Sequence, residues 1–270
     1  MKNTTRLLFF LLLAAPFGKT MGQSLSAKQM AMAGIKAAAL DNWSAGNPSS
    51  CAFGRSFSGY AGIENRFLGT DIQGFAVGGA YRFSKLGSFQ IGINRLGIEH
   101  LFVQELSLGY ARKLGSKVAL GGNLLVFSRQ ADRYDKQQRI SFNLGAQFPL
   151  SENIQAGLYL SNPIPDRREL PAYSFHSEIA AGISWKITKL TTSFEISKPQ
   201  NTSYSIKTGL DYRPAKSISL LGGVIVSKQD LNASLGISYR LNQISLTMAS
   251  RFHPKLPTGL SFGIRYAPLE

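Results

Sequence analysis

The side chains of this sequence that are best suited to acid–base chemistry belong to two glutamates. Glu178 and Glu195 fall on two adjacent segments that are predicted to be strands, and paired carboxylates can share acid–base work. The rest of the sequence holds no nucleophile motif, no metal-ligand spacing and no phosphate-binding loop. We therefore expect a protein that is not an enzyme and uses no cofactor or metal. Catalysis by the two carboxylates stays open as an alternative.

The segments that carry these glutamates belong to a repeated pattern. From about Arg55 to Tyr266, stretches of alternating apolar and small or polar residues are separated by turns. In Ile140–Phe148, for example, serine, asparagine, glycine and glutamine alternate with apolar residues. Because successive side chains of a strand point to opposite sides, one face is apolar and the other polar. This pattern is typical of a transmembrane antiparallel β-barrel of the bacterial outer membrane.

The pattern predicts about fourteen strands. They are Arg55–Ile63, Ile72–Phe83, Ser88–Asn94, Phe102–Leu114, Val118–Ser128, Ile140–Phe148, Ile154–Ser161, Phe175–Ile187, Leu190–Ser197, Tyr204–Tyr212, Ile218–Val226, Ala233–Leu241, Ile244–Phe252 and Gly259–Tyr266. Tight connections alternate with longer ones, such as Arg129–Arg139 and Asn162–Ser174. Short turns of outer-membrane barrels face the periplasm, so an even strand number places both termini there.

The start of the chain has a different composition. Lys2 and Arg6 precede the apolar run Leu7–Phe17, and small residues follow, which predicts a signal peptide over residues 1–23. Residues 24–53 are rich in alanine and glycine, nearly uncharged and too short for a domain. We expect them to lie inside the barrel mouth as a plug or hatch, and residues 54–270 to form the barrel.

Composition and charge narrow the range of partners. The net charge is +15, but the basic residues are scattered and form no basic helix or patch interleaved with aromatic residues, which argues against nucleic acid. Attraction of anionic lipid head groups or of an anionic permeant explains this positive charge better than nucleic-acid binding does. Cys51 is the only cysteine, so no intrachain disulfide forms, and we expect it to be a buried small residue.

Strand parity assigns a set of side chains to the barrel interior. Both signs of charge occur there, which predicts a salt-bridged interior that holds a plug, or else a polar path for a permeant. Leu125, Phe127 and Tyr159 are inward-facing apolar residues that would line a pocket for a hydrophobic ligand or pack against the hatch. The polar candidates are Arg82, Glu105, Asn143, Glu178, Glu195, Lys207, Asp211, Arg240, Arg251 and Arg265.

Several strands also share a glycine followed by an aromatic residue one to three positions on. Most of these aromatic residues face lipid near a short turn, which predicts an aromatic girdle at the periplasmic interface, and the glycines would relieve crowding on a curved wall. The motif occurs at Gly79-Ala80-Tyr81, Leu108-Gly109-Tyr110, Gly157-Leu158-Tyr159, Gly182-Ile183-Ser184-Trp185, Gly209-Leu210-Asp211-Tyr212, Gly236-Ile237-Ser238-Tyr239 and Gly263-Ile264-Arg265-Tyr266.

The segment before the barrel resembles known outer-membrane families. It reads Ala31-Met32-Ala33-Gly34, then Ala37-Ala38-Ala39-Leu40-Asp41, then Asn47-Pro48. This succession is similar to the start of FadL-like long-chain fatty-acid transporters and, more closely, of PorV/PorQ-type barrels of type IX protein secretion. The resemblance implies fourteen strands, an N-terminal hatch and a hatch motif formed by Asp41, Asn47 and Pro48. Asn47 and Pro48 would hold the hatch against the wall.

Four functions compete at this point. A PorV/PorQ-like barrel would serve protein secretion or the cell surface through protein partners, with a plugged lumen. A FadL-like transporter would pass a hydrophobic small molecule across the outer membrane. A porin-like channel would need an open lumen, which residues 24–53 oppose. A soluble β protein is the reading outside the membrane class, and extraction of the protein by carbonate would favour it.

Overall fold

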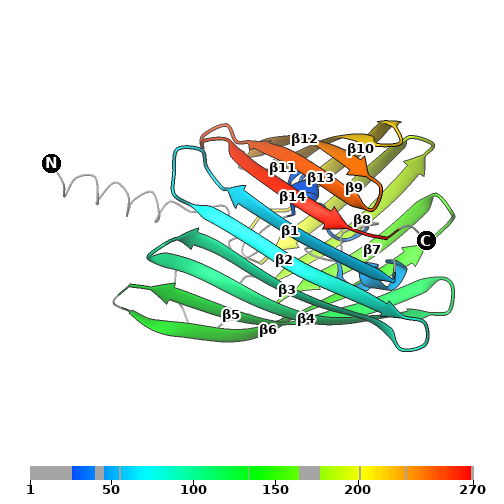
Figure 1. Cartoon of the computed structure of the whole chain (residues 1–270), viewed down its shortest axis with the longest axis horizontal. Helices are drawn as coiled ribbons and strands as arrows, with labels where there is room; N and C mark the ends of the chain where they lie inside the picture. Colours follow the sequence, from blue (N-terminus) through cyan, green and yellow to red (C-terminus); the bar gives the residue numbers. More distant parts are fainter. Residues whose placement is uncertain are drawn as a thin grey trace.

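The computed structural model describes residues 26–39, 46–54, 56–132, 134–163, 177–200, 202–228 and 230–268. Fourteen antiparallel strands in this part of the chain follow one another around a closed barrel (Figure 1). The strands are β1 (Phe57–Asn65), β2 (Gln73–Phe83), β3 (Gly87–Ile98), β4 (Leu101–Leu114), β5 (Val118–Ala131), β6 (Tyr134–Pro149), β7 (Ile154–Ser161), β8 (Glu178–Ile187), β9 (Leu190–Pro199), β10 (Ser205–Ala215), β11 (Ile218–Ser227), β12 (Leu231–Leu241), β13 (Ile244–Phe252) and β14 (Gly259–Tyr266). The predicted barrel and its strand number are confirmed.

The barrel closes between its first and last strands. β1 pairs with β14 from Gly59, opposite Tyr266, to Asn65, opposite Leu260, and with β2 on its other side. A closed sheet has no free strand edge, which is the condition for placing a sheet in lipid. No helix in the described part of the chain is long and apolar enough to span a membrane.

The wall is apolar outside and polar inside, as the alternation predicts. Along β8, Ile179, Ile183 and Trp185 are exposed on the outer face, whereas Glu178 and Ser184 are buried on the inner face. Large exposed apolar side chains recur on every strand of the wall, which is the surface that lipid covers. Near the tight turns, the rings of Tyr81, Phe83, Phe89 and Tyr110 form a contact chain with centroid separations of 4.6, 5.8 and 5.1 Å.

The two ends of the barrel differ. The short-turn end carries the connections 84–86, 115–117, 150–153, 188–189, 216–217 and 242–243, and β1 begins and β14 ends there, on the right of Figure 1. We call the opposite end the loop end. There the connections 66–72, 162–177, 200–204 and 253–258 are longer than most short turns, but 99–100 and 132–133 are two residues each.

The long loop predicted over Arg129–Arg139 is wrong. β5 continues to Ala131 and β6 begins at Tyr134, so this stretch is paired hairpin that reaches beyond its neighbours at the loop end (Figure 1). All five side chains of Tyr134–Gln138 are exposed. Strands that extend out of the apolar band have water on both faces and lose the alternation on which the prediction depended. β3 also continues beyond its predicted end, to Ile98.

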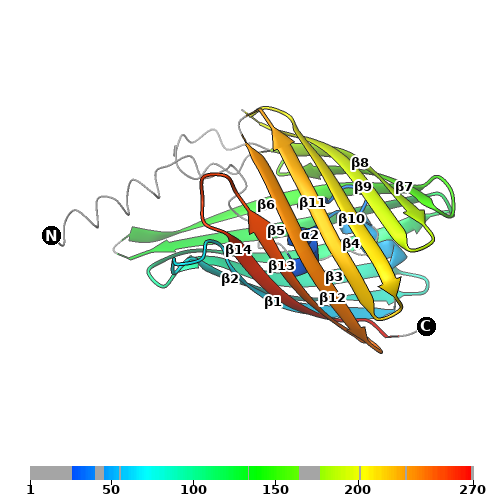
Figure 2. The same ribbon diagram turned by 90° about the horizontal axis from the view of Figure 1, so that it is seen from above.

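The described residues before β1 lie inside the barrel, where Figure 2 shows α2 surrounded by strands. We call residues 26–39 and 46–54 the inner segment. It contains α2 (Ala27–Ala31), capped by the Ser26 hydroxyl, and the 3₁₀ helix η1 (Pro48–Phe53), capped by Asn47. Between them, Ala33 and Gly34 take positive φ values of 58° and 67°, which turn the chain sharply after α2.

Candidate functional site: the occupied lumen

Eight glycines of the wall face the inner segment, and we call them the glycine track. The segment passes them in order as it follows the inner wall from β14 round to β5. Gly263 faces Ala27, Gly236 faces Ala31, Gly223 faces Ala33, Gly209 faces Met32 and Ile35, Gly182 and Gly157 face Ala37, Gly145 faces Asn47, and Gly121 faces Ser49. The inner segment is therefore attached along most of the circumference.

Because these glycines have no side chain, the backbone of the inner segment can lie directly against the backbone of the wall. A Cβ on Gly121 would lie 2.6 Å from the Ser49 backbone nitrogen, and one on Gly223 would lie 2.5 Å from the Ala33 nitrogen. Six of the eight glycines form three cross-strand pairs, at 121 and 145, 157 and 182, and 209 and 223. Glycine permits this close approach because it carries no Cβ. The predicted role of the glycines, relief of crowding on a curved wall, misses this contact.

Asn47 joins the inner segment to the wall. Its side chain is fully buried, and its Nδ2 group donates to the carbonyl oxygens of Ala37 at 2.8 Å, Leu158 at 2.8 Å and Ala146 at 3.1 Å. Its Oδ1 accepts from the Ser49 backbone N–H at 3.0 Å. The amide thus spans two stretches of the inner segment and strands β6 and β7. Pro48 is also buried beside the wall, whereas Asp41, the third residue of the hatch motif, lies outside the described residues.

Four buried charged side chains form a second anchor, which we call the charge cluster. Lys36 of the inner segment donates to Glu178 at 3.0 Å, and Lys207 donates to Glu195 at 2.7 Å and lies 3.6 Å from Glu178. Glu195 is fully buried, and its second oxygen accepts the backbone N–H groups of Lys36 at 2.6 Å and Ala37 at 2.7 Å. Two positive and two negative charges balance, so none of the four is left uncompensated.

The electrostatics of the cluster favour attachment over catalysis. Burial alone would lower the pKa of Lys36, but the Glu178 carboxylate, with Tyr159 and Glu195, raises it above its ordinary value. Lys36 Nζ also lies 5.4 Å from the centroid of the Tyr159 ring. Both carboxylates are engaged by lysines and by the backbone of the inner segment, which accounts for these two glutamates without acid–base chemistry.

The other polar candidates are spread along the barrel. Asp211 is buried and pairs with Lys28 and Arg213, both at 3.1 Å. Glu105 accepts from Asn94 at 3.1 Å and Asn143 accepts from Ser161 at 2.9 Å. The remaining four stand at strand ends: Arg82, Arg240 and Arg265 at the short-turn end, and Arg251 near Glu64 and Arg66 at the loop end. Of the ten predicted residues, the structure brings only Glu178, Glu195 and Lys207 into one cluster.

The three apolar candidates are buried but do not share one place. Tyr159 is 1% exposed and packs with Ala37 and Ala180, so it covers the inner segment. Leu125 and Phe127 are 2% and 6% exposed and lie two strands away on β5. Tyr159 therefore fits the alternative already stated for it, packing against the plug, whereas the other two belong to a separate part of the interior.

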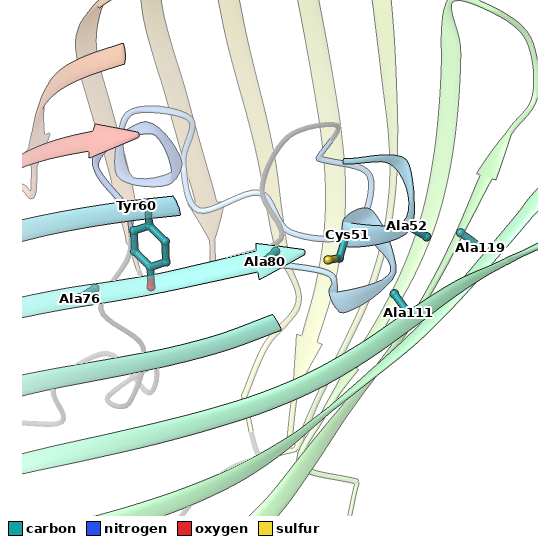
Figure 3. Close-up of a cluster of buried hydrophobic side chains, with 7 residues drawn as sticks. All are labelled: Cys51, Ala52, Tyr60, Ala76, Ala80, Ala111 and Ala119. Atoms are coloured by element: carbon teal, nitrogen blue, oxygen red, sulfur yellow. The ribbon is translucent and has the colours of Figure 1, made fainter. Parts of the chain in front are cut away.

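η1 packs at the short-turn end against the wall of strands β2 to β6. Cys51 and Ala52 lie beside Ala111 of β4 and Ala119 of β5 in a cluster of small buried side chains (Figure 3). Burial raises the pKa of the Cys51 thiol to about 11, against the opposing effects of Ser88 and Arg82. Within the described residues, no group of three histidine, cysteine, aspartate or glutamate side chains is placed to hold a metal ion.

Sequence reasoning missed two parts of this site. Lys36 was not singled out, although Lys28 and Lys36 are the only charged residues that the inner segment contributes. The glycine track was also missed, although five of its members belong to the glycine–aromatic motif and recur every 25 to 27 residues from Gly157 to Gly263. In four of these five, from Gly182 to Gly263, the inward glycine is followed three positions on by an outward aromatic residue, and this was the available signal.

An apolar outer face, a polar inner face and a closed fourteen-stranded wall define a transmembrane β-barrel of the outer-membrane type. No protein-family model matches the sequence, and no curated protein matches it. Solved structures match along almost the whole barrel at low sequence identity, so what they share with this chain is the fold.

The chain shares its fold with solved structures of outer-membrane proteins. The toluene transporter TbuX of Ralstonia pickettii is 12% identical, with a TM-score of 0.70 over 92% of this chain and 99% of that chain. A Pseudomonas aeruginosa FadL homologue is 10% identical, with a TM-score of 0.69 over 92% and 99%. The monoaromatic hydrocarbon channel CymD is 11% identical, with a TM-score of 0.67 over 92% and 98%. Nothing among these matches supports the PorV/PorQ secretion reading.

Proposed function

We propose that this barrel passes small hydrophobic compounds across the outer membrane and that the inner segment is its plug. The observation that carries the proposal is a closed barrel whose lumen is occupied by an attached segment of the same chain. Structures of this fold include proteins described as hydrocarbon channels and a toluene transporter. On this proposal residues 1–23 direct export, residues 24–53 are the plug and the short turns face the periplasm.

The attachment of the inner segment suits a plug that can shift. Its contacts with the glycine track are made largely by alanines, and a methyl-sized group contributes only about 0.8 kcal/mol on burial. The specific attachment is made at Asn47 and the charge cluster, by hydrogen bonds from Ser234, Gln147 and Ser184 to carbonyl oxygens of the inner segment, and by the ion pair of Lys28 with Asp211. None of these contacts belongs to the strand ladders, so the segment can leave the wall while each strand keeps both neighbours.

A disulfide between plug and wall tests whether the plug must move. A Cβ on Gly263 would lie 3.3 Å from the Ala27 Cβ and 3.7 Å from the nearest backbone atoms, close to the separation of about 3.5–4.5 Å in disulfides. The variant carries Ala27→Cys and Gly263→Cys, with Cys51→Ala to remove the native thiol. We expect uptake of a radiolabelled monoaromatic hydrocarbon or fatty acid to fall under oxidising conditions and to recover on reduction.

Uptake is measured in cells that keep a lipopolysaccharide outer leaflet, because a phospholipid bilayer passes such compounds unaided. The two single-cysteine variants serve as controls for oxidation itself. No uptake above that of cells without the barrel, in either redox state, would overturn the transport proposal. Uptake that is unaffected by a formed disulfide would retain transport but reject movement of α2.

A further inference from the structure

A cavity of about 200 Å³ lies at the short-turn end, between the inner segment and strands β8 to β10. It is separate from the charge cluster and from the three apolar candidates. The part contributed by the inner segment includes Met32 and Ile35, and the wall contributes Ser184, Thr191 and Ser193. The cavity therefore has an apolar side and a hydroxyl-bearing side.

The charge around the cavity is positive. Lys28, Lys186 and Arg213 line it together with a single carboxylate, Asp211. Asp211 is shared, at 3.1 Å from Lys28 Nζ and 3.1 Å from an Arg213 nitrogen. Lys186 is exposed and makes no ion pair with any residue that the structure describes. Three positive charges against one negative charge favour an anion at this place.

The hydroxyl groups of the wall are already used in part. Ser184 Oγ donates to the Ala38 carbonyl at 2.8 Å and lies 2.7 Å from Ser193 Oγ. Ser184 thus holds the inner segment against β8, and Ser193 of β9 supports Ser184, so the inner-segment side of the cavity is fixed by a contact that also docks the segment. The apolar body of a ligand bound here would contact apolar side chains, and its head group would lie near the cationic groups.

The size of the cavity sets the size of the ligand. A cavity of about 150 Å³ in another protein is large enough for benzene. A volume of about 200 Å³ thus takes one aromatic ring or a short alkyl chain together with a carboxylate. We propose that this cavity binds a small organic carboxylate, with its apolar body against Met32 and Ile35 and its carboxylate at Lys186. The proposal goes beyond hydrophobic transport and can be tested without it.

Binding is measured by isothermal titration of the detergent-folded full-length barrel with benzoate, with benzyl alcohol as the uncharged probe and inorganic phosphate as the anion without an apolar body. Empty micelles give the blank. We expect saturable benzoate binding to one site, at least tenfold tighter than binding of either other probe. Equal binding of benzyl alcohol would overturn the anionic part of the proposal, and equal binding of phosphate the apolar part.

Two variants locate the site. Lys186→Gln should weaken benzoate binding about tenfold, the low end for loss of a charge-assisted hydrogen bond near solvent. Lys216→Gln removes the same charge from an exposed turn outside the cavity and should leave binding unchanged. Thr191→Leu should block binding by filling the cavity. Equal losses in the two lysine variants, or undiminished binding in Thr191→Leu, would place the anion elsewhere and overturn the proposal, whatever the outcome of the uptake assay.

Discussion

Replacing Glu195 with glutamine should weaken the docking of the inner segment while leaving the barrel intact. The carboxylate is fully buried, accepts from Lys207 at 2.7 Å and receives two backbone N–H groups of the inner segment at 2.6 and 2.7 Å. Glutamine has nearly the same shape but no charge, and one of its two terminal groups is a donor. Either Lys207 or the two N–H groups would then face an NH₂ group.

The loss of docking free energy in Glu195→Gln is set by the charged and polar groups that stay buried without their partner. Removing one partner of a buried ion pair costs about 3–5 kcal/mol. Glutamine keeps one accepting oxygen, and Lys207 keeps Glu178 at 3.6 Å, so the low end applies. A loss of about 3 kcal/mol lowers the ratio of docked to undocked segment about 100-fold. The strand ladders of β9 are untouched, so the barrel itself should lose little stability.

Hydrogen exchange followed by mass spectrometry reads out this change. Amides of peptides containing Lys36 and Ala37 should exchange about 100-fold faster in Glu195→Gln, and amides of β9 and β10 should not. Glu152→Gln makes the same chemical change in an exposed short turn and is the matched control. Unchanged exchange at Lys36 and Ala37 in Glu195→Gln would refute the view that this carboxylate anchors the segment.

Three further predictions follow from the same contacts. Gly157→Ala places a methyl group against the Ala37 carbonyl oxygen and should raise ion conductance across planar bilayers, whereas Gly222→Ala, with no contact nearer than 3.8 Å, should not. Cys51, with a pKa of about 11, should react with a maleimide at pH 8 at least 100-fold more slowly than a free thiol, and a rate near that of a peptide thiol would show that η1 is undocked. The carboxylates beside Lys36 raise the pKa of its ammonium group. The contribution of Lys36 to docking is therefore complete below the ordinary pKa of 10.5 and is lost only as the pH rises through the higher folded-state value. We expect the conductance to stay constant from about pH 6 to 9. A change within that range would assign control to another group.

The barrel could be predicted because lipid outside and water inside impose one simple alternation. That rule fails where the environment changes. The hairpin around Arg129–Arg139 leaves the lipid, so its strands carry no apolar face and the sequence there reads as a loop. Outward aromatic residues such as Trp185 and Tyr212 were predicted correctly because lipid is their only environment.

The interior was predicted less well because the role of each inward-facing side chain depends on the particular residue that it contacts. Parity turned Glu178, Glu195 and Lys207 inward, but their meeting with Lys36 depends on the path of the inner segment, which has no periodicity to read. Parity likewise put Tyr159 with Leu125, although the stagger of the strands gives them different neighbours. The family resemblance indicated that Asn47 is important, but its hydrogen bonds to β6 and β7 could be identified only in the structure.

Asn47 offers a test that separates capping of η1 from attachment to the wall. Asn47→Asp keeps an oxygen for the Ser49 N–H, and aspartate caps helices as well as asparagine does. It replaces the donating NH₂ group with an oxygen that faces the carbonyls of Ala37 and Leu158, each 2.8 Å from the native nitrogen.

A buried acceptor without its donor costs about 1–3 kcal/mol, and the aspartate must also carry a charge or take up a proton there, so docking should weaken by at least 3 kcal/mol. Asn47→Ser keeps a shorter cap and merely omits the donor. Cys51 labelling should therefore be slowest in the native chain, faster in Asn47→Ser and fastest in Asn47→Asp, by about 100-fold over the native rate. If Asn47→Asp labelled as slowly as the native chain, the cap would be sufficient to hold η1, and the hydrogen bonds of Asn47 to the wall would not be needed for attachment of the inner segment.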